Sequence, residues 1–326
     1  MHYLFATIRT TLYLKCVLLT VFYLSISLLN TIEGTCGKPF YAPILSATEE
    51  HGNRISNGIE ARRHSHPWQA LLSVWIRSSL LTCGGSLIDW RGGNASDLVL
   101  TAAHCVTDLE DNTEPSLWEE VTYFFNRLFK NGISGPTVNA SDVRVFLGVH
   151  DLADLTPPTI HIGVSAIAIG EFNKFCHMDD FALLKLEREI VYNEFIQGIC
   201  LPDESEDMPP PESPCLVTGW GLKANGKPAQ TLQQMDAPIF YGYVDKSIFH
   251  KGRMICIYKK EKYAGTRRGD SGGPLACLKN DTFVIYGVLS FGIIENCNEG
   301  TKKTAFMKLP HYMKWIRTTI AQLGNN

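Results

Sequence analysis

The sequence has little net charge, no clustered metal ligands and no repeats. Its 30 lysine and arginine residues nearly balance 33 aspartate and glutamate residues, which gives a formal net charge of -3. A chain without a strongly basic field is not expected to bind nucleic acid. Histidine and cysteine do not recur at the spacing of metal sites, so we expect neither a metal nor another cofactor. The 326 residues suffice for one large or two small globular domains.

Long apolar runs are also scarce, and the main one lies near the amino terminus. Basic residues precede an uninterrupted run of apolar and hydroxyl residues from Cys16 to Leu29. This run is too short to span a bilayer comfortably, so it indicates a cleaved signal peptide over residues 1–30 rather than an anchor. We place the cleavage between Ser27 and Thr35. The expected product is a secreted, extracellular protein with no stable membrane association.

Cysteines and sequons fit this route. Nine of the ten cysteines follow Cys16, and in an oxidising compartment they are expected to form disulfides, with one left over because the number is odd. Three Asn-x-Ser/Thr sequons begin at Asn94, Asn139 and Asn280, and each is a candidate glycosylation site.

The apolar pattern changes at Ile55. The polar stretch from Thr35 to Arg54 has the composition of a linker or pro-segment. Short apolar runs then alternate with Gly, Pro, Asn and Asp, and include residues 69–74, 98–102, 143–147, 181–186, 216–219 and 284–289. Many short strands separated by turn residues predict an all-β sandwich or barrel.

Two stretches have helical periodicity instead. The first opens with the capping box Ser116-x-x-Glu119 and ends at Gly132. The second follows Pro310 and ends the chain. Its apolar residues are Tyr312, Trp315, Ile316, Ile320 and Leu323. We expect this second helix to dock on the body of the protein.

A serine flanked by glycines is the strongest candidate for chemistry. In Gly269-Asp270-Ser271-Gly272-Gly273, glycine lets the backbone turn tightly and bring amide groups close to a substrate. A serine hydroxyl attacks a carbonyl only if a base takes its proton. We expect Ser271 to be the nucleophile and the N–H groups of Gly269 and Ser271 to form an oxyanion hole.

A base and an acid are available elsewhere in the chain. His104 ends an apolar strand beside Cys105, a position that is also compatible with a structural histidine. Asp180 leads into the apolar run of residues 181–186, where an unpaired carboxylate is costly. Asp180 therefore needs a partner, and an imidazolium would serve.

These three residues stand within a longer series of motifs. In chain order the motifs are Arg54-Ile55-Ser56-Asn57-Gly58, Pro67-Trp68-Gln69, Cys83-Gly84-Gly85-Ser86-Leu87, Thr101-Ala102-Ala103-His104-Cys105, Asp180-Phe181-Ala182-Leu183-Leu184, Cys200-Leu201-Pro202, Thr218-Gly219-Trp220-Gly221, the Ser271 loop and Ser290-Phe291-Gly292. From Ile55 to its end the chain resembles the chymotrypsin/trypsin family of serine proteases. The resemblance implies an all-β fold of two six-stranded antiparallel barrels, with the catalytic residues in the cleft between them.

The resemblance also implies roles for single residues. Ser271 is the nucleophile, His104 the general base and then acid, and Asp180 its orienting partner, whereas the neighbouring Asp179 lacks the right spacing. Backbone groups of the Ser290-Phe291-Gly292 stretch are expected to pair with the substrate as an added strand. Protein or peptide substrates follow as partners, together with protein inhibitors.

Activation by cleavage is a further implication. A cut after Arg54 would free the α-amino group of Ile55, which in this family enters the interior and pairs with the acid beside the nucleophile, here Asp270. An activating protease is thus an expected partner. The resulting division is a signal peptide over 1–30, a pro-segment over 31–54 tethered through Cys36, and a peptidase domain over 55–326.

The family pattern implies three disulfides, Cys83 with Cys105, Cys215 with Cys277, and Cys36 with Cys200. Cys256 and Cys297 occupy positions of two further family bridges, but Asp245 and Arg267 hold the usual partner positions. Either Cys256 and Cys297 pair with each other, with Cys176 left over, or the pairing is rearranged.

The expected specificity pocket departs from trypsin-like relatives. Gly265 replaces the acidic floor residue, and Thr304 stands where the family usually has a glycine in the wall. Without a buried carboxylate, a basic residue before the cleaved bond (P1) is disfavoured. We expect small or medium uncharged P1 residues at a pocket that also includes Thr266. The alternatives are aromatic residues, basic residues held by Glu295, and acidic residues held by Arg267 or Arg268.

Two other departures concern loops near the site. The chain between His104 and Gly148 is much longer than usual and contains the Ser116 helix, which either overhangs the cleft or folds onto its own barrel. Val149 replaces an expected acidic ligand, so no calcium loop is expected. A rival to the enzyme hypothesis is a catalytically silent homologue that binds partners, although the three catalytic candidates are all present.

Overall fold

A computed structural model describes residues 36–45, 58–108, 137–172, 178–210, 213–223, 225–239, 252–259, 266–292 and 302–324. Several sequence predictions fall outside these ranges, namely the signal peptide over 1–30, Arg54, Ile55, the helix from Ser116 to Gly132, Cys176, Gly265, Glu295 and Cys297. Within the described ranges, no helix has both the length and the apolar character needed to cross a membrane.

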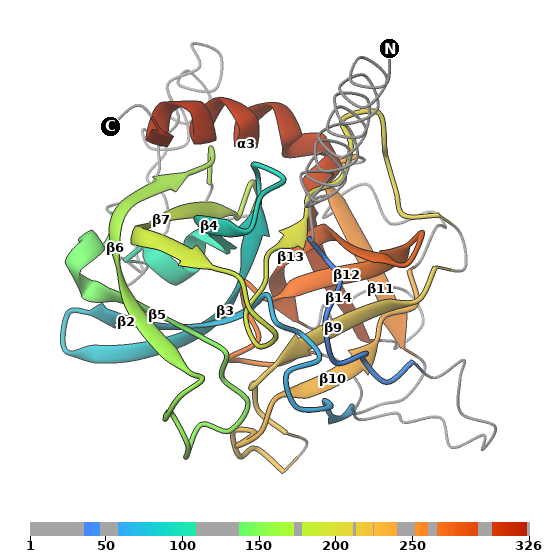
Figure 1. The fold of residues 1–326 in the computed structure, drawn as a ribbon, viewed down its shortest axis with the longest axis horizontal. Coiled ribbons are helices and arrows are strands. Elements are labelled where there is room, and N and C mark those ends of the chain that lie inside the picture. Colours follow the sequence, from blue (N-terminus) through green and yellow to red (C-terminus); the bar gives the residue numbers. More distant parts are fainter. Residues whose placement is uncertain are drawn as a thin grey trace, which may run out of the picture.

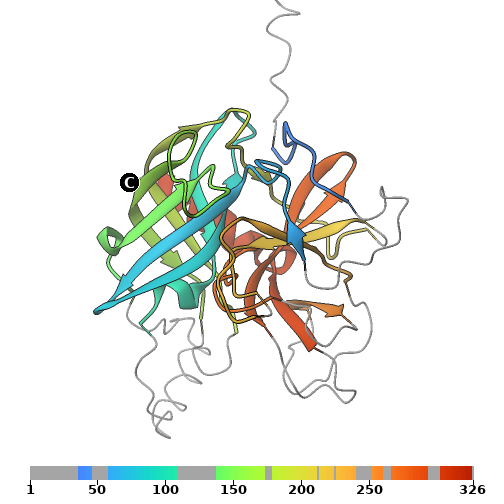
Figure 2. The same cartoon turned by 90° about the horizontal axis from the view of Figure 1, so that it is seen from below.

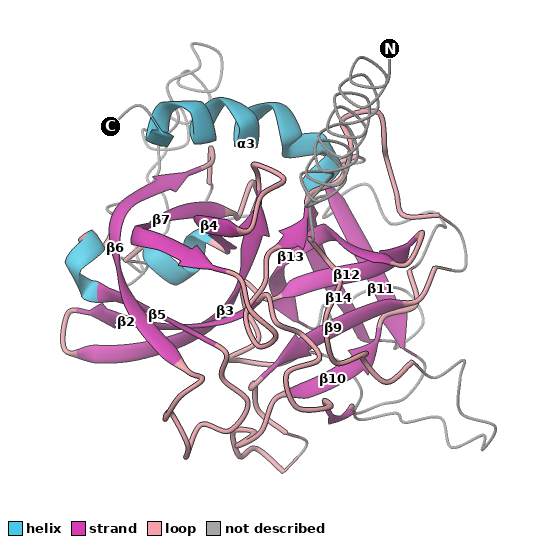
Figure 3. Cartoon of the chain, viewed as in Figure 1, coloured by secondary structure: helices cyan, strands magenta, loops and turns pink. Residues whose placement is uncertain are grey.

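The first barrel is a closed ring of six antiparallel strands (Figures 1 and 3). The strands are β2 (Gln69–Ile76), β3 (Ser79–Asp89), β4 (Ala95–Thr101), β5 (Val143–Leu147), β6 (Ile160–Ile169) and β7 (Ala182–Val191). Their hydrogen-bonded order is β2, β3, β4, β7, β6, β5 and back to β2. In β5 the side chains of Val143, Val145 and Leu147 are buried and Arg144 is exposed, the alternation of a strand with one face on a core.

The second barrel lies beside the first, as the view from below shows (Figure 2). Its strands are β9 (Cys215–Gly219), β10 (Gln233–Asp236), β11 (Met254–Lys259), β12 (Pro274–Lys279), β13 (Thr282–Gly292) and β14 (Lys302–Lys308). They pair in the order β10, β9, β12, β13, β14, β11, and a bridge between Ile239 and Ile257 closes the ring. The short β1 (Ile59–Glu60) joins β10, and β8 (Ile199–Cys200) connects β3 with β13. The predicted two-barrel fold is confirmed.

The predicted carboxy-terminal helix is α3 (Leu309–Gly324), which follows β14 directly. Pro310 lies in its first turn, where a missing N–H costs nothing. Its buried residues include Tyr312, Ile316 and Ile320. Figure 1 shows α3 leaving the second barrel and crossing over the first. The helix therefore links the two barrels.

The described part of the chain contains three disulfides, Cys36–Cys200, Cys83–Cys105 and Cys215–Cys277. They are the three bridges that the family resemblance implied. Cys256 has a buried side chain on β11, packed beside Ala305 and Phe291.

The segment 36–45 is docked by more than its disulfide. The Gly37 N–H donates to the Gly198 carbonyl at 2.9 Å, and the Gly37 carbonyl accepts from Phe283 N–H at 2.8 Å. At the other end, the Gln234 side-chain amide donates to the Ile44 carbonyl at 2.6 Å. The segment is thus bound along the seam formed by β8, β13 and β10.

Candidate active site

Three loops at the junction of the barrels carry the predicted catalytic residues. His104 lies in the short 3-10 helix η2 (Ala103–Val106) that follows β4, Asp180 lies in the turn before β7, and Ser271 lies in the turn before β12. The first two loops belong to the first barrel and the third to the second barrel. The disulfide Cys83–Cys105 fastens the residue after His104 to β3.

His104 and Asp180 form a buried pair. Nδ1 of His104 lies 2.7 Å from Asp180 Oδ2, and the His104 backbone N–H donates to Oδ1 at 2.8 Å. The Ser290 hydroxyl of β13 donates to the same Oδ2. Asp180 is fully buried, so each of these donors replaces a water molecule that the carboxylate has lost.

The charges of the pair stabilise each other. Burial alone would lower the pKa of His104, but attraction to Asp180 and the hydrogen bond with it outweigh burial and place this pKa above its usual value. Burial alone would raise the pKa of Asp180, but the charge of His104 and the hydrogen bonds from His104 and Ser290 bring it below its usual value. An ionised Asp180 can therefore orient the imidazole through Nδ1 and stabilise the imidazolium, an arrangement in which proton exchange would fall to Nε2.

Ser271 lies where the two barrels touch. The Gly84 N–H of β3 donates to the Ser271 carbonyl at 2.7 Å. The next residue, Gly272, has φ of 82°, and a Cβ there would lie 2.3 Å from Thr101 Oγ1 and 2.4 Å from the Gly84 carbonyl oxygen. Only glycine fits this contact. The nucleophile loop is thus pressed against the end of β4, from which η2 and His104 continue.

Two backbone N–H groups beside Ser271 are suited to bind an oxyanion. Gly269 has φ of 102°, a conformation that L side chains rarely adopt. Within the described part of the chain, neither the Gly269 nor the Ser271 N–H has a hydrogen-bond acceptor. Both donors are therefore available to a charge that develops on a substrate carbonyl.

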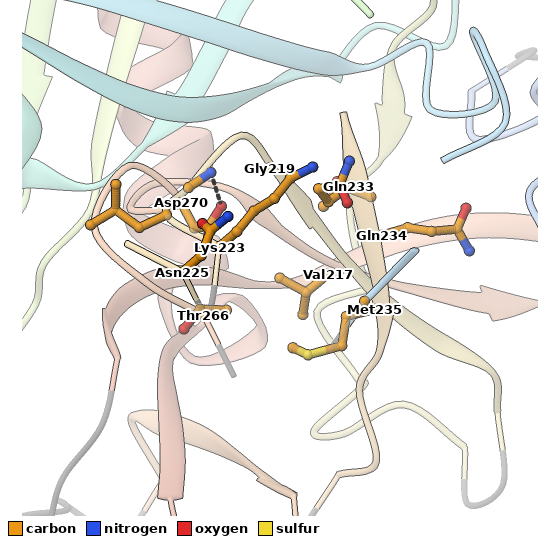
Figure 4. Close-up of a pocket in the computed structure, with 13 residues that line it drawn as sticks. Val217, Gly219, Lys223, Asn225, Gln233, Gln234, Met235, Thr266 and Asp270 are labelled. Atoms are coloured by element: carbon orange, nitrogen blue, oxygen red, sulfur yellow. Dashed lines mark hydrogen bonds between the residues drawn. The ribbon is translucent and has the colours of Figure 1, made fainter. Parts of the chain in front are cut away.

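Asp270 lines a cavity of about 330 Å³ that borders β9 and β10 of the second barrel (Figure 4). Its Oδ1 accepts the Gly221 N–H at 2.7 Å and its Oδ2 accepts the Arg267 N–H at 2.9 Å. Burial raises the pKa of Asp270, and these backbone hydrogen bonds and the charge of Arg267 offset the rise only in part. The carboxyl group is thus placed where an added cation would stabilise its ionised form.

Glycines make room for this carboxyl group. A Cβ on Gly219 would lie 2.2 Å from Asp270 Oδ1, and one on Gly221 would lie 2.4 Å from its Oδ2. Both glycines belong to the Thr218-Gly219-Trp220-Gly221 motif. The motif carries the family resemblance in the sequence, but its function as the cradle of Asp270 becomes visible only in the fold.

Of the predicted specificity pocket, the described residues include Thr266 and Thr304 but not Gly265 or Glu295. The hydroxyl oxygens of Thr266 and Thr304 lie 3.1 Å apart, and both side chains are buried. Thr304 of β14 pairs with Gly292 of β13. The pairing of β13 with β12 ends at Val288 and Pro274, whereas its pairing with β14 continues to Gly292. The backbone from Ser290 to Gly292 is the stretch for which the sequence predicts pairing with an extended substrate.

Asp179 does not face the histidine. Its carboxylate accepts from the Tyr312 hydroxyl at 2.6 Å and from Arg253 at 2.9 and 3.1 Å. The structure therefore brings Asp180, rather than Asp179, to His104. Sequence reasoning missed Arg253 and the hydroxyl of Tyr312, because the ring of Tyr312 fits the apolar face of a helix equally well without a polar partner.

Two further sequence expectations concern ligands and modification. The side chains of Cys83, His104 and Cys105 offer ligand atoms within 4.8 Å of one another, but the two sulfur atoms form a disulfide and cannot bind a metal as thiolates. The sequon residues Asn94, Asn139 and Asn280 all have exposed side chains, as glycan attachment requires.

Two β-barrels that meet at a serine loop and a buried His-Asp pair have the architecture of serine proteases. The trypsin family model matches residues 55–122 and 133–316. Similar proteins include chymotrypsin-C of Bos taurus, 33% identical over 293 residues (86% of this chain and 92% of that protein), and chymotrypsin-like elastase family member 1 of Macaca fascicularis, 32% identical over 282 residues (83% and 91%). The human form of the latter is 31% identical over 284 residues (83% and 94%). The chain belongs to the trypsin family and is a serine-type endopeptidase.

Proposed function

We propose that this chain is a secreted endopeptidase, made as a zymogen, with His104, Asp180 and Ser271 as its catalytic triad. The buried His104–Asp180 pair, with 2.7 Å between Nδ1 and Oδ2, is the observation that carries the proposal. A structural histidine does not need an anionic partner at its Nδ1, whereas a general base does. The sequence comparisons support the same chemistry.

In the proposed reaction, Ser271 Oγ attacks the substrate carbonyl while His104 Nε2 takes its proton. The N–H groups of Gly269 and Ser271 bind the oxyanion, and Asp180 stabilises the imidazolium. His104 then donates the proton to the leaving amine, and the acyl-enzyme forms. Water attacks the ester with His104 again as base, which restores Ser271 and releases the second product.

The cavity at Asp270 supports activation by cleavage after Arg54. Gly58 lines this cavity, and Ile55 precedes Gly58 by three residues, a span of about 10 Å when extended. The new α-amino group of Ile55 can thus reach the cavity. There its positive charge would compensate the burial of Asp270 and hold the adjoining oxyanion loop in place.

Secretion and tethering of the pro-segment complete the proposal. A signal peptide over 1–30 would direct the chain to an oxidising compartment, which agrees with its disulfides. The Cys36–Cys200 bridge would keep the pro-segment 31–54 attached to the peptidase domain 55–326 after activation. The three exposed sequons would carry glycans, and an activating protease, protein substrates and protein inhibitors would be the partners.

For specificity we propose small or medium uncharged P1 residues. The Thr266–Thr304 contact supports this preference, because these two buried side chains reduce the width of the pocket and present hydroxyl groups but no charge. A P1-varied peptide library would test this preference, and strong selection for arginine would contradict it.

A fluorophosphonate probe tests the central assignment. The protein cleaved after Arg54 should be labelled at Ser271 and should hydrolyse peptide bonds, whereas the Ser271→Ala variant should do neither. A silent homologue would leave the processed protein unlabelled and inactive. The Arg54→Gln variant tests activation. If this uncleaved variant hydrolysed peptide esters as fast as the cleaved protein does, the zymogen hypothesis would be wrong.

A further inference from the structure

Contacts of Asp179, the residue before Asp180, hold the turn that carries Asp180. Asp179 has φ of 55°, a left-handed conformation that is uncommon for residues other than glycine, asparagine and aspartate. Its buried carboxylate accepts a hydrogen bond from the Tyr312 hydroxyl on α3. Both carboxylate oxygens also accept from Nη1 of Arg253, with which Asp179 forms an ion pair. The unusual backbone conformation directs this side chain away from His104 and toward the helix.

The residue after Asp180 is fastened to the same helix. Phe181 is 1% exposed, and its ring centroid lies 4.3 Å from that of Tyr312 and 4.8 Å from that of Trp315. The Phe181 N–H also donates to the Asp179 carbonyl at 2.9 Å, which keeps the turn tight. Asp180 is thus bracketed by two side chains that both end on α3.

The residues that hold this turn, Arg253 and Tyr312, follow it in the chain and connect it to the second barrel. Arg253 directly precedes β11, and its carbonyl accepts from the Lys308 N–H at the end of β14, at 2.8 Å. Tyr312 lies one turn into the helix that continues from β14. The turn of Asp180, which belongs to the first barrel, is therefore held by Arg253 of the second barrel and by the helix that follows that barrel in the chain.

Arg253 also offsets the repulsion between two neighbouring carboxylates. Asp179 and Asp180 are adjacent and both buried, so two carboxylates would repel each other in a medium that screens charge poorly. Arg253 neutralises the first carboxylate, and His104 partners the second. The two adjacent acids thus have separate partners, a permanently charged guanidinium for Asp179 and an imidazole that can become charged for Asp180.

We propose that Asp179, through Tyr312 and Arg253, is a positioning residue for the reaction: it holds the Asp180 carboxylate at the place where it orients His104. This inference rests on the proposed triad. Misplacement of a reacting group by about 1 Å lowers a rate by up to about a hundredfold. Because Asp179 does not line the substrate edge of β13, its loss should act on kcat and leave KM nearly unchanged.

Three variants separate hydrogen bonding from backbone conformation. Asp179→Gly keeps the left-handed φ and removes the carboxylate. Asp179→Asn also tolerates that φ and can still accept a hydrogen bond from Tyr312. Arg317→Met is the matched control, because it removes an ion pair between the same helix and Glu204 whose two side chains are more than half exposed.

The assay is peptide hydrolysis by the cleaved protein, with active sites counted by fluorophosphonate titration. We expect Asp179→Gly to lower kcat at least about tenfold with KM within about twofold, Asp179→Asn to stay within about threefold of the unchanged protein, and Arg317→Met to match it. A kcat for Asp179→Gly within twofold of the unchanged protein would overturn the proposal, whatever its Tm. Equal losses in Asp179→Gly and Asp179→Asn would overturn it as well.

Two further measurements cover other outcomes. If Asp179→Gly does not fold, Tyr312→Phe removes one hydroxyl donor while keeping the ring against Phe181, and an unchanged kcat in that variant would contradict the proposal. The downfield proton NMR signal of His104 Nδ1–H reports the Asp180 hydrogen bond without turnover. Loss of this signal in Asp179→Gly would support the positioning role of Asp179 even if the unchanged protein were inactive. Inactivity of the unchanged protein would instead refute the proposed function.

Discussion

Asp270→Asn is the substitution that most directly tests how the nucleophile loop is held. The two carboxylate oxygens accept separate backbone hydrogen bonds, from Gly221 at 2.7 Å and from Arg267 at 2.9 Å. An asparagine of the same shape has one oxygen and one NH₂ group. One of the two backbone donors would therefore face another donor, and the side chain would have no charge to pair with the amino group of Ile55.

The size of the effect follows from these contacts. A hydrogen bond to a charged acceptor contributes about 1.5–3 kcal/mol, and removal of one partner from a buried ion pair costs about 3–5 kcal/mol. If this energy is what keeps the Gly269 loop in its active form, its loss lowers the active population by roughly a hundredfold to several thousandfold. We expect kcat/KM of the cleaved Asp270→Asn protein to fall by at least about a hundredfold.

The assay compares proteins with the same amino terminus. Both the unchanged protein and the variant are cleaved after Arg54, the new terminus at Ile55 is verified by sequencing, and hydrolysis of a peptide ester is measured. Asp281→Asn is the control, because it removes a charge from the exposed turn between β12 and β13 and keeps a residue that tolerates positive φ. A cleaved Asp270→Asn protein with kcat/KM within threefold of the unchanged protein would refute the reasoning.

Three more predictions follow from the charges and volumes of buried groups. The pKa of His104 is raised and only neutral imidazole acts as base, so kcat/KM should rise with pH through a midpoint above about 6.5 and fall above about 8 as the Ile55 amine deprotonates. In Asp180→Asn the midpoint of the rise should move to lower pH, and a midpoint below 6 in the unchanged protein would contradict this prediction. Thr304→Gly should open the pocket wall and raise the ratio of kcat/KM for phenylalanine over alanine at P1 by about tenfold or more, measured with matched peptides; an unchanged ratio would show that Thr304 does not border the P1 side chain. Burial lowers the pKa of His66 to about 4, so its neutral form stabilises the fold above about pH 6.5, and about 3 kcal/mol should be lost as pH falls to 4; urea unfolding at both pH values measures this, and the loss should shrink in His66→Gln.

The local parts of the fold and site could be predicted from short stretches of sequence. The run of residues 143–147 coincides with β5, because every second side chain faces the core. The run of residues 181–186 predicts only the first half of β7, which continues to Val191. Its later residues include three consecutive exposed side chains, those of Glu187, Arg188 and Glu189. A search for apolar runs therefore stops before the strand ends.

The parts that sequence reasoning missed depend on contacts between distant residues. Arg253 lies 74 positions from Asp179, and Tyr312 lies 133 positions from it. No periodicity connects such residues, and each has a plausible separate role in its own element. The glycines around Asp270 were visible as a motif, yet their purpose depends on a carboxylate that reaches them from 49 positions along the chain.

The site also depends on how the barrels dock, which leads to a last prediction. Asp180 is held by His104 of the first barrel and by Ser290 of the second, and Ser271 bonds through its carbonyl to Gly84 across the same junction. The barrels also share a buried apolar cluster, but hydrogen bonds tolerate less displacement than apolar packing, so a small shift of one barrel breaks the contacts at the site before the strands unfold. Activity measured in increasing urea should therefore disappear before the far-ultraviolet circular dichroism of the strands. Tryptophan fluorescence is the wrong probe for this comparison, because the buried ring of Trp68 lies 5.4 Å from that of Phe283 on β13 and reports the junction itself. Coincident curves for activity and circular dichroism would show instead that the junction and the barrels unfold as one unit.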